Sequence, residues 1–117
     1  MREKVRDRGR LEHIREQLQN IDEFLCDKSF DDLQNDKILQ YAVIKSVEII
    51  GEASYMLSSE FKDKHAEIAW NEIVKMRHVL VHGYYHISIP MLWSIVQEDL
   101  PELSNRILPI LEVSDDL

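Results

Sequence analysis

The spacing of apolar residues is the feature that most limits what this chain can fold into. No stretch alternates apolar and polar residues over the length of a strand, and the 117 residues include only three glycines and three prolines. In the first segment the apolar residues recur at steps of three and four, the repeat of one helix face: Leu11, Ile14, Leu18, Ile21 and Leu25. The sequence therefore predicts an all-α fold, an antiparallel bundle of four to five helices with short connections.

The second predicted helix begins after Asp36 as its N-cap and ends at Leu57 or Ser58. Its broad apolar side contains Leu39, Val43, Val47, Ile50, Ala53 and Leu57, and is widened by Ile38, Ala42, Ile44 and Ile49. Its polar side is a thin stripe of Tyr41, Lys45, Glu48, Glu52 and Tyr55. Such a helix is expected at the centre of the fold. Because so small a chain has much apolar surface to cover on this helix, we also predict a homodimer.

The boundaries of the later helices follow from capping residues and prolines. A third helix is expected from Trp70 or Asn71 to about His82, where Gly83 can end it. The last helix is expected to be capped by Ser88. Pro101 removes a backbone donor, so we expect a kink or a break there.

Charge and composition narrow the class of protein. Fourteen Lys and Arg against 22 Asp and Glu give a net charge of −8, which argues against broad nucleic-acid binding, although residues 1–15 hold six basic and only three acidic groups. The length predicts a single domain, residues 1–117. Cys26 alone excludes an intrachain disulfide. Without a signal-like start or an apolar run of membrane-spanning length, a cytoplasmic protein is expected.

Titratable groups are concentrated between residues 76 and 86, which hold three of the five histidines and two of the four tyrosines. Arg77 falls within the apolar arc of the third helix, so it needs a carboxylate partner or a polar cleft. Glu48 and Glu52 are the expected partners. An internal ion pair that only fixes helix register is an equally good interpretation, and His82 at a helix C-terminus can equally serve as a cap.

A metal site is the first chemical alternative. His78 and His82 are four residues apart, and His86 follows at the same step. Imidazoles at this spacing can share one ion. Because Gly83 is expected to end the helix before His86, this third histidine would not lie on the same helix face as His78 and His82. We therefore predict neither a metal site nor a cofactor.

The residues Arg77, His82 and Tyr84 spell R-x4-H-x-Y, which resembles the signature of the HEPN ribonucleases, and in particular of the HepT-like toxins. Three longer blocks resemble the same family: RDRGRLEHIREQL, QYAVIKSVEIIGEAS and LWSIVQEDLPEL. His78 departs from the pattern, since relatives often have Asn there. The resemblance covers nearly the whole chain and implies a HEPN-like, homodimeric bundle.

This resemblance implies a metal-independent endoribonuclease in which the 2′-hydroxyl of RNA attacks the adjacent phosphate. His82 would move the proton, and Arg77 would hold the phosphate and stabilise its extra negative charge. In the family the motif faces its copy across a dimer interface, so the RNA cleft would be composite. His78, Glu48 and Glu52 are the predicted supporting residues.

The resemblance also implies regulation as a toxin-antitoxin pair. The partner would be a minimal nucleotidyltransferase antitoxin, MntA-like, which inactivates the toxin by attaching AMP to Tyr84; Tyr85 is a second possible acceptor. The added phosphodiester would repel and occlude RNA. Two other functions stay open: a non-catalytic helical subunit that regulates a nucleotidyltransferase, and a nucleotide-binding helical domain.

Overall fold

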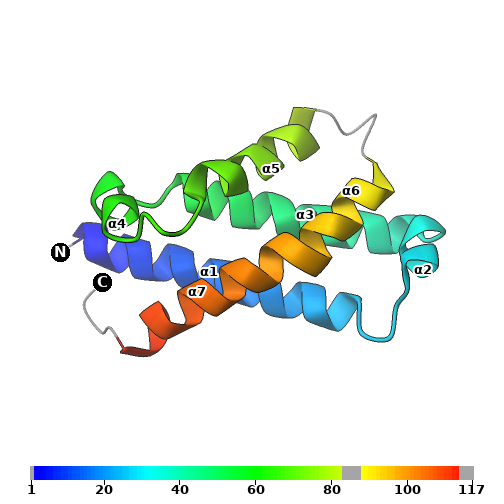
Figure 1. Cartoon of the computed structure of the whole chain (residues 1–117), viewed down its shortest axis with the longest axis horizontal. Coiled ribbons are helices and arrows are strands. Elements are labelled where there is room, and N and C mark those ends of the chain that lie inside the picture. The colour runs from blue at the N-terminus through cyan, green and yellow to red at the C-terminus, as the bar shows by residue number, and fades with distance from the viewer. Residues whose placement is uncertain (1, 83–87, 114–117) are drawn as a thin grey trace.

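The computed structural model describes the backbone of residues 2–82 and 88–113, and the side chains of residues 7–76 and 88–112. Every regular element among these residues is helical, which confirms the all-α prediction (Figure 1). The long elements are α1 (Arg2–Phe24), α3 (Lys37–Tyr55), α5 (Trp70–His82) and α7 (Leu100–Val113). The short elements are α2 (Phe30–Gln34), α4 (Ser59–Lys64), α6 (Ile89–Ser94) and a π-helical turn, η2 (Ile95–Asp99).

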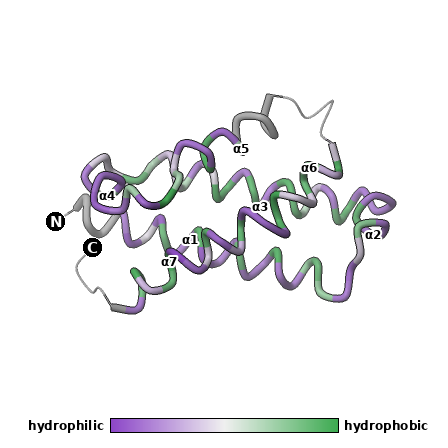
Figure 2. The backbone as a smooth tube through the Cα atoms, in the orientation of Figure 1, coloured by the Kyte–Doolittle hydropathy of each residue, from purple (hydrophilic) through white to green (hydrophobic). Residues whose placement is uncertain are grey.

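The helix α3 is central, as predicted. It lies between α1 and α5 and packs against both, while α6, η2 and α7 form one continuous rod that crosses the bundle and packs on α1 (Figure 1). Figure 2 shows hydrophobic (green) and hydrophilic (purple) stretches following one another along the long helices, as expected when each helix has one buried side.

The core uses the residues that the helical repeats predict. Leu11, Ile14, Leu18 and Ile21 of α1 are buried, as are all six residues assigned to the main apolar side of the second predicted helix. That helix, α3, ends at Tyr55 and is thus slightly shorter than predicted, so Leu57 lies just beyond it. Leu25, Ala42, Ile44 and Ile49 are half-buried, and Ile38 is 82% exposed. It stands seven residues, two helical turns, before Lys45, and therefore lies on the polar stripe. Since the chain's own core covers the apolar side of α3, that side gives no reason for a dimer.

The predicted helix starts are confirmed by capping hydrogen bonds. The Asp36 carboxylate accepts from the Leu39 N–H at 3.1 Å, and the Ser88 hydroxyl accepts from the Met91 N–H at 3.3 Å. The chain stays helical through Pro101, so it is not broken there; the irregularity before it is the π-helical turn η2, which ends two residues earlier. Proline has no N–H to donate to the preceding turn, so the regular ladder cannot continue through this point.

A buried carboxylate that the sequence analysis did not single out joins α1 to α4. Asp7 is buried, and its two oxygens accept from the backbone N–H of Ser58 at 2.8 Å and from the Ser58 hydroxyl at 2.6 Å. The same hydroxyl oxygen accepts from the Phe61 N–H at 3.1 Å, which caps α4. Asp7 therefore fixes the start of the connection between α3 and α5.

Candidate functional site

The motif lies at the end of α5, whose first turns are firmly placed. Trp70 and Ile73 are buried against the core. The Trp70 indole N–H donates to the His65 carbonyl at 3.1 Å, and its ring lies 5.9 Å from the Phe61 ring, centroid to centroid. The helix extends to His82, as the sequence predicts. Packing at the start of α5 therefore orients the helix whose last turns contain Arg77 and His82.

Helical register relates the motif residues to the described part of α5. Arg77 follows Ile73 by four residues and Trp70 by seven, so its position lies on the buried side. The positions of His78 and His82 follow Asn71 and Lys75 by seven residues each, and both of these are exposed. The backbone thus places Arg77 and His82 on different sides of the helix.

The side chains of Arg77, His78 and His82 are not among those described, and Tyr84, Tyr85 and His86 lie outside the described residues. Their roles therefore stay predictions, and so does the histidine alternative for metal binding. Among the residues that the structure describes, no group of three or more His, Cys, Asp or Glu side chains is arranged to hold a metal ion.

The two carboxylates predicted to support the motif lie on the polar stripe of α3. The Glu48 carboxylate is 3.7 Å from the Lys45 ammonium, an i to i+3 pair in which the lysine is largely exposed. Glu52 is exposed. Such surface pairs contribute little to stability. The expectation that either carboxylate pairs with Arg77 stays a prediction.

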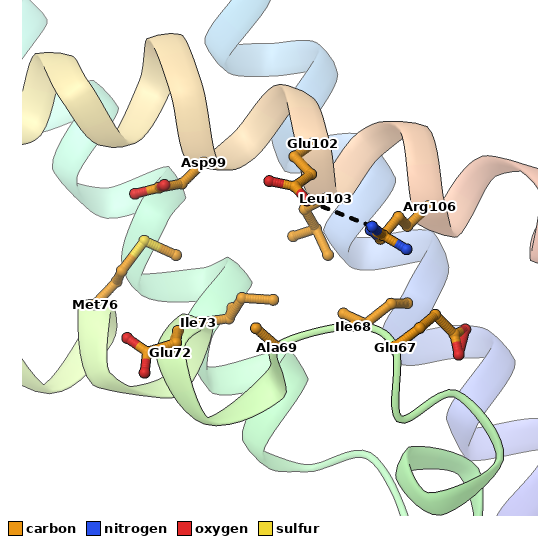
Figure 3. A pocket seen from close by; sticks show the side chains of 10 residues that line it. All are labelled: Glu67, Ile68, Ala69, Glu72, Ile73, Met76, Asp99, Glu102, Leu103 and Arg106. Carbon is orange, nitrogen blue, oxygen red and sulfur yellow. Dashed lines mark ion pairs between the residues drawn. The ribbon is translucent and has the colours of Figure 1, made fainter.

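A groove that the sequence analysis missed lies between the start of α5 and the rod of η2 and α7 (Figure 3). Its volume is about 270 Å³, and it is lined by Ile68, Ile73, Met76 and Leu103, with Glu67, Glu72, Asp99, Glu102 and Arg106 among the polar residues. Only Arg106 is basic, and its guanidinium lies 3.5 Å from the Glu102 carboxylate. These residues come from segments far apart in sequence, so no local pattern could reveal the groove.

The electrostatics of this groove disfavour RNA. Partial burial raises the pKa of Asp99, and the nearby charges of Glu98, Glu102 and Glu72 raise it further. A surface on which neighbouring carboxylates already repel one another also repels phosphate groups. RNA is therefore not expected to run along this groove, although the groove reaches Met76, the residue before Arg77.

Comparison with known proteins identifies the family. The model of the family described as "Ribonuclease HepT-like" matches residues 14–110. The chain belongs to the HepT-like ribonuclease family. The match extends from α1 to α7 and includes the positions of Arg77, His82 and Tyr84. The resemblance inferred from the motif is thereby confirmed, and so is the assignment to a family of ribonucleases.

Several curated relatives carry ribonuclease names. The "Probable ribonuclease HepT" of Thermococcus cleftensis is 43% identical over 96 residues, covering 82% of this chain and 87% of that protein. The "Gamma-glutamylcyclotransferase and putative RNase" of Methanocaldococcus jannaschii is 41% identical over 105 residues; the match covers 90% of this HepT-like chain but 47% of the longer relative. No solved structure matches with significance. No helix in the described ranges is long and apolar enough to cross a membrane.

Proposed function

We propose that this HepT-like chain is a metal-independent endoribonuclease toxin that cuts RNA at a site formed by Arg77 and His82. The observation that carries the proposal is the R-x4-H-x-Y motif at the end of α5, in a chain whose residues 14–110 match the HepT-like family. The ribonuclease names of the relatives support the same reaction class.

The reaction needs a base, an acid and a fixed positive charge. One imidazole of His82 takes the proton from the RNA 2′-hydroxyl, and the resulting oxygen attacks the adjacent phosphorus. The bond from phosphorus to the 5′-oxygen breaks, and that oxygen leaves with a proton from a second, protonated imidazole. Arg77 stabilises the extra negative charge of the pentacoordinate phosphorus. The products are a 2′,3′-cyclic phosphate and a 5′-hydroxyl.

A homodimer supplies the second imidazole, because each chain carries one copy of the motif. The net charge of −8 and the acidic groove beside Met76 mean that RNA must be held by a small basic cleft. Two copies of Arg77 facing one another would provide such a cleft. Binding that depends on a few phosphate contacts weakens as salt increases.

Tyr84 is the proposed control point. A cognate nucleotidyltransferase antitoxin would transfer AMP from ATP to its hydroxyl: the hydroxyl gives up its proton to solvent, its oxygen bonds to the α-phosphorus, and pyrophosphate leaves with the electron pair of the broken phosphorus–oxygen bond. The new phosphodiester would carry a negative charge two residues along the chain from His82, and this charge would repel the RNA phosphate. Mass spectrometry after coexpression with such an enzyme should find AMP on the parent and on Tyr85→Phe, but not on Tyr84→Phe.

Cleavage of a labelled RNA by purified protein tests the site. Arg77→Ala and His82→Ala should each lower the cleavage rate by at least about 100-fold. His13→Ala is the matched control, because His13 is an exposed imidazole on α1, and it should cut like the parent. If both motif variants cut RNA as fast as the parent, the proposed site is wrong. A stable complex with the nucleotidyltransferase but no cleavage at all would instead favour the regulatory subunit.

A further inference from the structure

The groove between α5 and the rod of η2 and α7 combines an apolar floor with an acidic rim. Ile68, Ile73 and Leu103 close its bottom and are buried. Met76 is half-buried and Ala69 is exposed, and both line the same groove (Figure 3). The groove is therefore a preformed recess with apolar surface open at Ala69 and Met76.

The rim of this groove has more negative charge than its own cations balance. Figure 3 shows Asp99 on the wall formed by η2 and Glu72 on the wall formed by α5. Partial burial raises the pKa of the Asp99 carboxyl, and every charged neighbour that raises it further is acidic, namely Glu98, Glu102 and Glu72. Arg106 is the only basic residue of the lining, and it already lies 3.5 Å from Glu102. A cation from another molecule would relieve this repulsion.

Charge and size decide which class of molecule fits the groove. RNA and anionic lipids bear phosphate groups, which the rim repels. The volume of about 270 Å³ lies below the range of about 300–1,000 Å³ that is typical of small-molecule sites. A recess between two helices is a common seat for the apolar face of a third helix, which inserts only a few side chains. Residues 114–117 of this chain are acidic and do not match the rim, so the occupant is a segment of another protein.

We propose that the groove between α5 and α7 binds a basic amphipathic helix of a partner protein. Apolar side chains of the partner would lie over Ala69 and Met76, and its Lys or Arg side chains would lie between Glu72 and Asp99. Lys and Arg suit this place because their alkyl stems cover apolar surface while their charged ends reach carboxylates. Lys75 does not fill this role, since its ion pair with Glu72 is 4.0 Å long and both side chains are largely exposed.

The groove is in line with the motif. Arg77 follows Ile73 by four residues, so the position of Arg77 lies one turn further along the same side of α5. A partner helix seated in the groove would therefore lie beside the last turns of α5. The docking itself does not depend on the proposed ribonuclease activity.

Fluorescence anisotropy with a synthetic peptide, measured without RNA, tests the docking. The probe is a labelled peptide whose leucines recur at steps of three and four and whose other positions are mostly lysine. The parent should bind it. Glu72→Lys should raise the Kd at least about 10-fold by reversing a rim charge. Ala69→Phe should raise it at least about 10-fold by filling the groove without changing the charge. Asp99→Asn, which keeps the size of the side chain, should raise it at least about 3-fold.

Two controls separate the groove from general attraction between a basic peptide and an acidic protein. Glu23→Lys reverses an exposed carboxylate on α1, changes the net charge as Glu72→Lys does, and should bind like the parent. A peptide with serine in place of each leucine should bind the parent at least about 10-fold more weakly than the probe. Circular dichroism checks that each variant is folded.

Four results would overturn the proposed docking. They are a parent that does not bind the probe, equal affinity for the serine peptide, equal weakening by Glu23→Lys and Glu72→Lys, and folded groove variants that bind as tightly as the parent. Because RNA is absent from the assay, none of these results bears on cleavage, and a chain that leaves RNA intact keeps the docking proposal.

Discussion

Asp7→Ala is the substitution whose cost can be worked out most directly from the structure. Asp7 is only 4% exposed, and its carboxylate accepts two hydrogen bonds from Ser58, at 2.8 and 2.6 Å. A hydrogen bond to a charged group contributes about 1.5–3 kcal/mol. Ser58 is only partly buried, so water can replace part of the loss, and the low end applies. The two bonds together predict a loss of about 3 kcal/mol in the free energy of unfolding.

Urea unfolding followed by circular dichroism measures this loss. Protein concentration must be held constant, because self-association shifts apparent stability. For a chain of this size the loss corresponds to a Tm lower by roughly 12 °C. Asp22→Ala, an exposed aspartate on the same helix, is the control and should change stability by less than about 0.5 kcal/mol.

A double-mutant cycle with Ser58→Ala assigns the loss to this contact. The two substitutions together should cost about 1 kcal/mol less than the sum of the single losses, because both remove the same hydroxyl hydrogen bond. An Asp7→Ala variant as stable as the parent, or strictly additive losses in the cycle, would refute the conclusion that Asp7 anchors α4.

Three further substitutions give expected outcomes. Asp99→Asn should raise stability at neutral pH. Because the folded chain raises the pKa of Asp99, ionisation of this carboxyl destabilises the fold; the destabilisation is absent below pH 3.8, where the carboxyl is protonated in both states, and develops as the pH rises. Melting curves should therefore show the gain at pH 7 and none below pH 3.8. Gly9→Ala should stabilise by about 0.5–1 kcal/mol in urea unfolding, since an added Cβ meets nothing within 4 Å; an unchanged midpoint would contradict this. Trp70→Phe should cost about 1 kcal/mol in the same assay by removing the hydrogen bond to His65, and no loss would show that this bond does not fix the start of α5.

Local patterns were sufficient to predict most of the fold. The three-and-four spacing in α1 and α3 identified the buried sides, and the N-caps Asp36 and Ser88 marked where helices begin. The misassigned residue, Ile38, shows the limit of reasoning from residue type. Its angular position on the helix matches that of Lys45, and position determines exposure in a helix with one free side.

Contacts between distant segments could not be predicted in this way. Asp7 and Ser58 are 51 residues apart in sequence, and nothing near either one indicates the other. The groove beside Met76 likewise needs α5 and α7 to be placed together. The candidate site could be predicted only through a resemblance to a family, which selected Arg77, His82 and Tyr84. Helical spacing alone would also allow a structural ion pair for Arg77 and a helix cap for His82.

The chemistry of the RNA ends tests the central claim most directly. Purified protein is incubated with a defined RNA in the presence of a chelator, and the products are identified by mass spectrometry. The proposed reaction predicts 2′,3′-cyclic phosphate and 5′-hydroxyl ends, produced without added metal and lost in His82→Ala. Products with 3′-hydroxyl and 5′-phosphate ends, or cleavage that requires Mg²⁺, would contradict it.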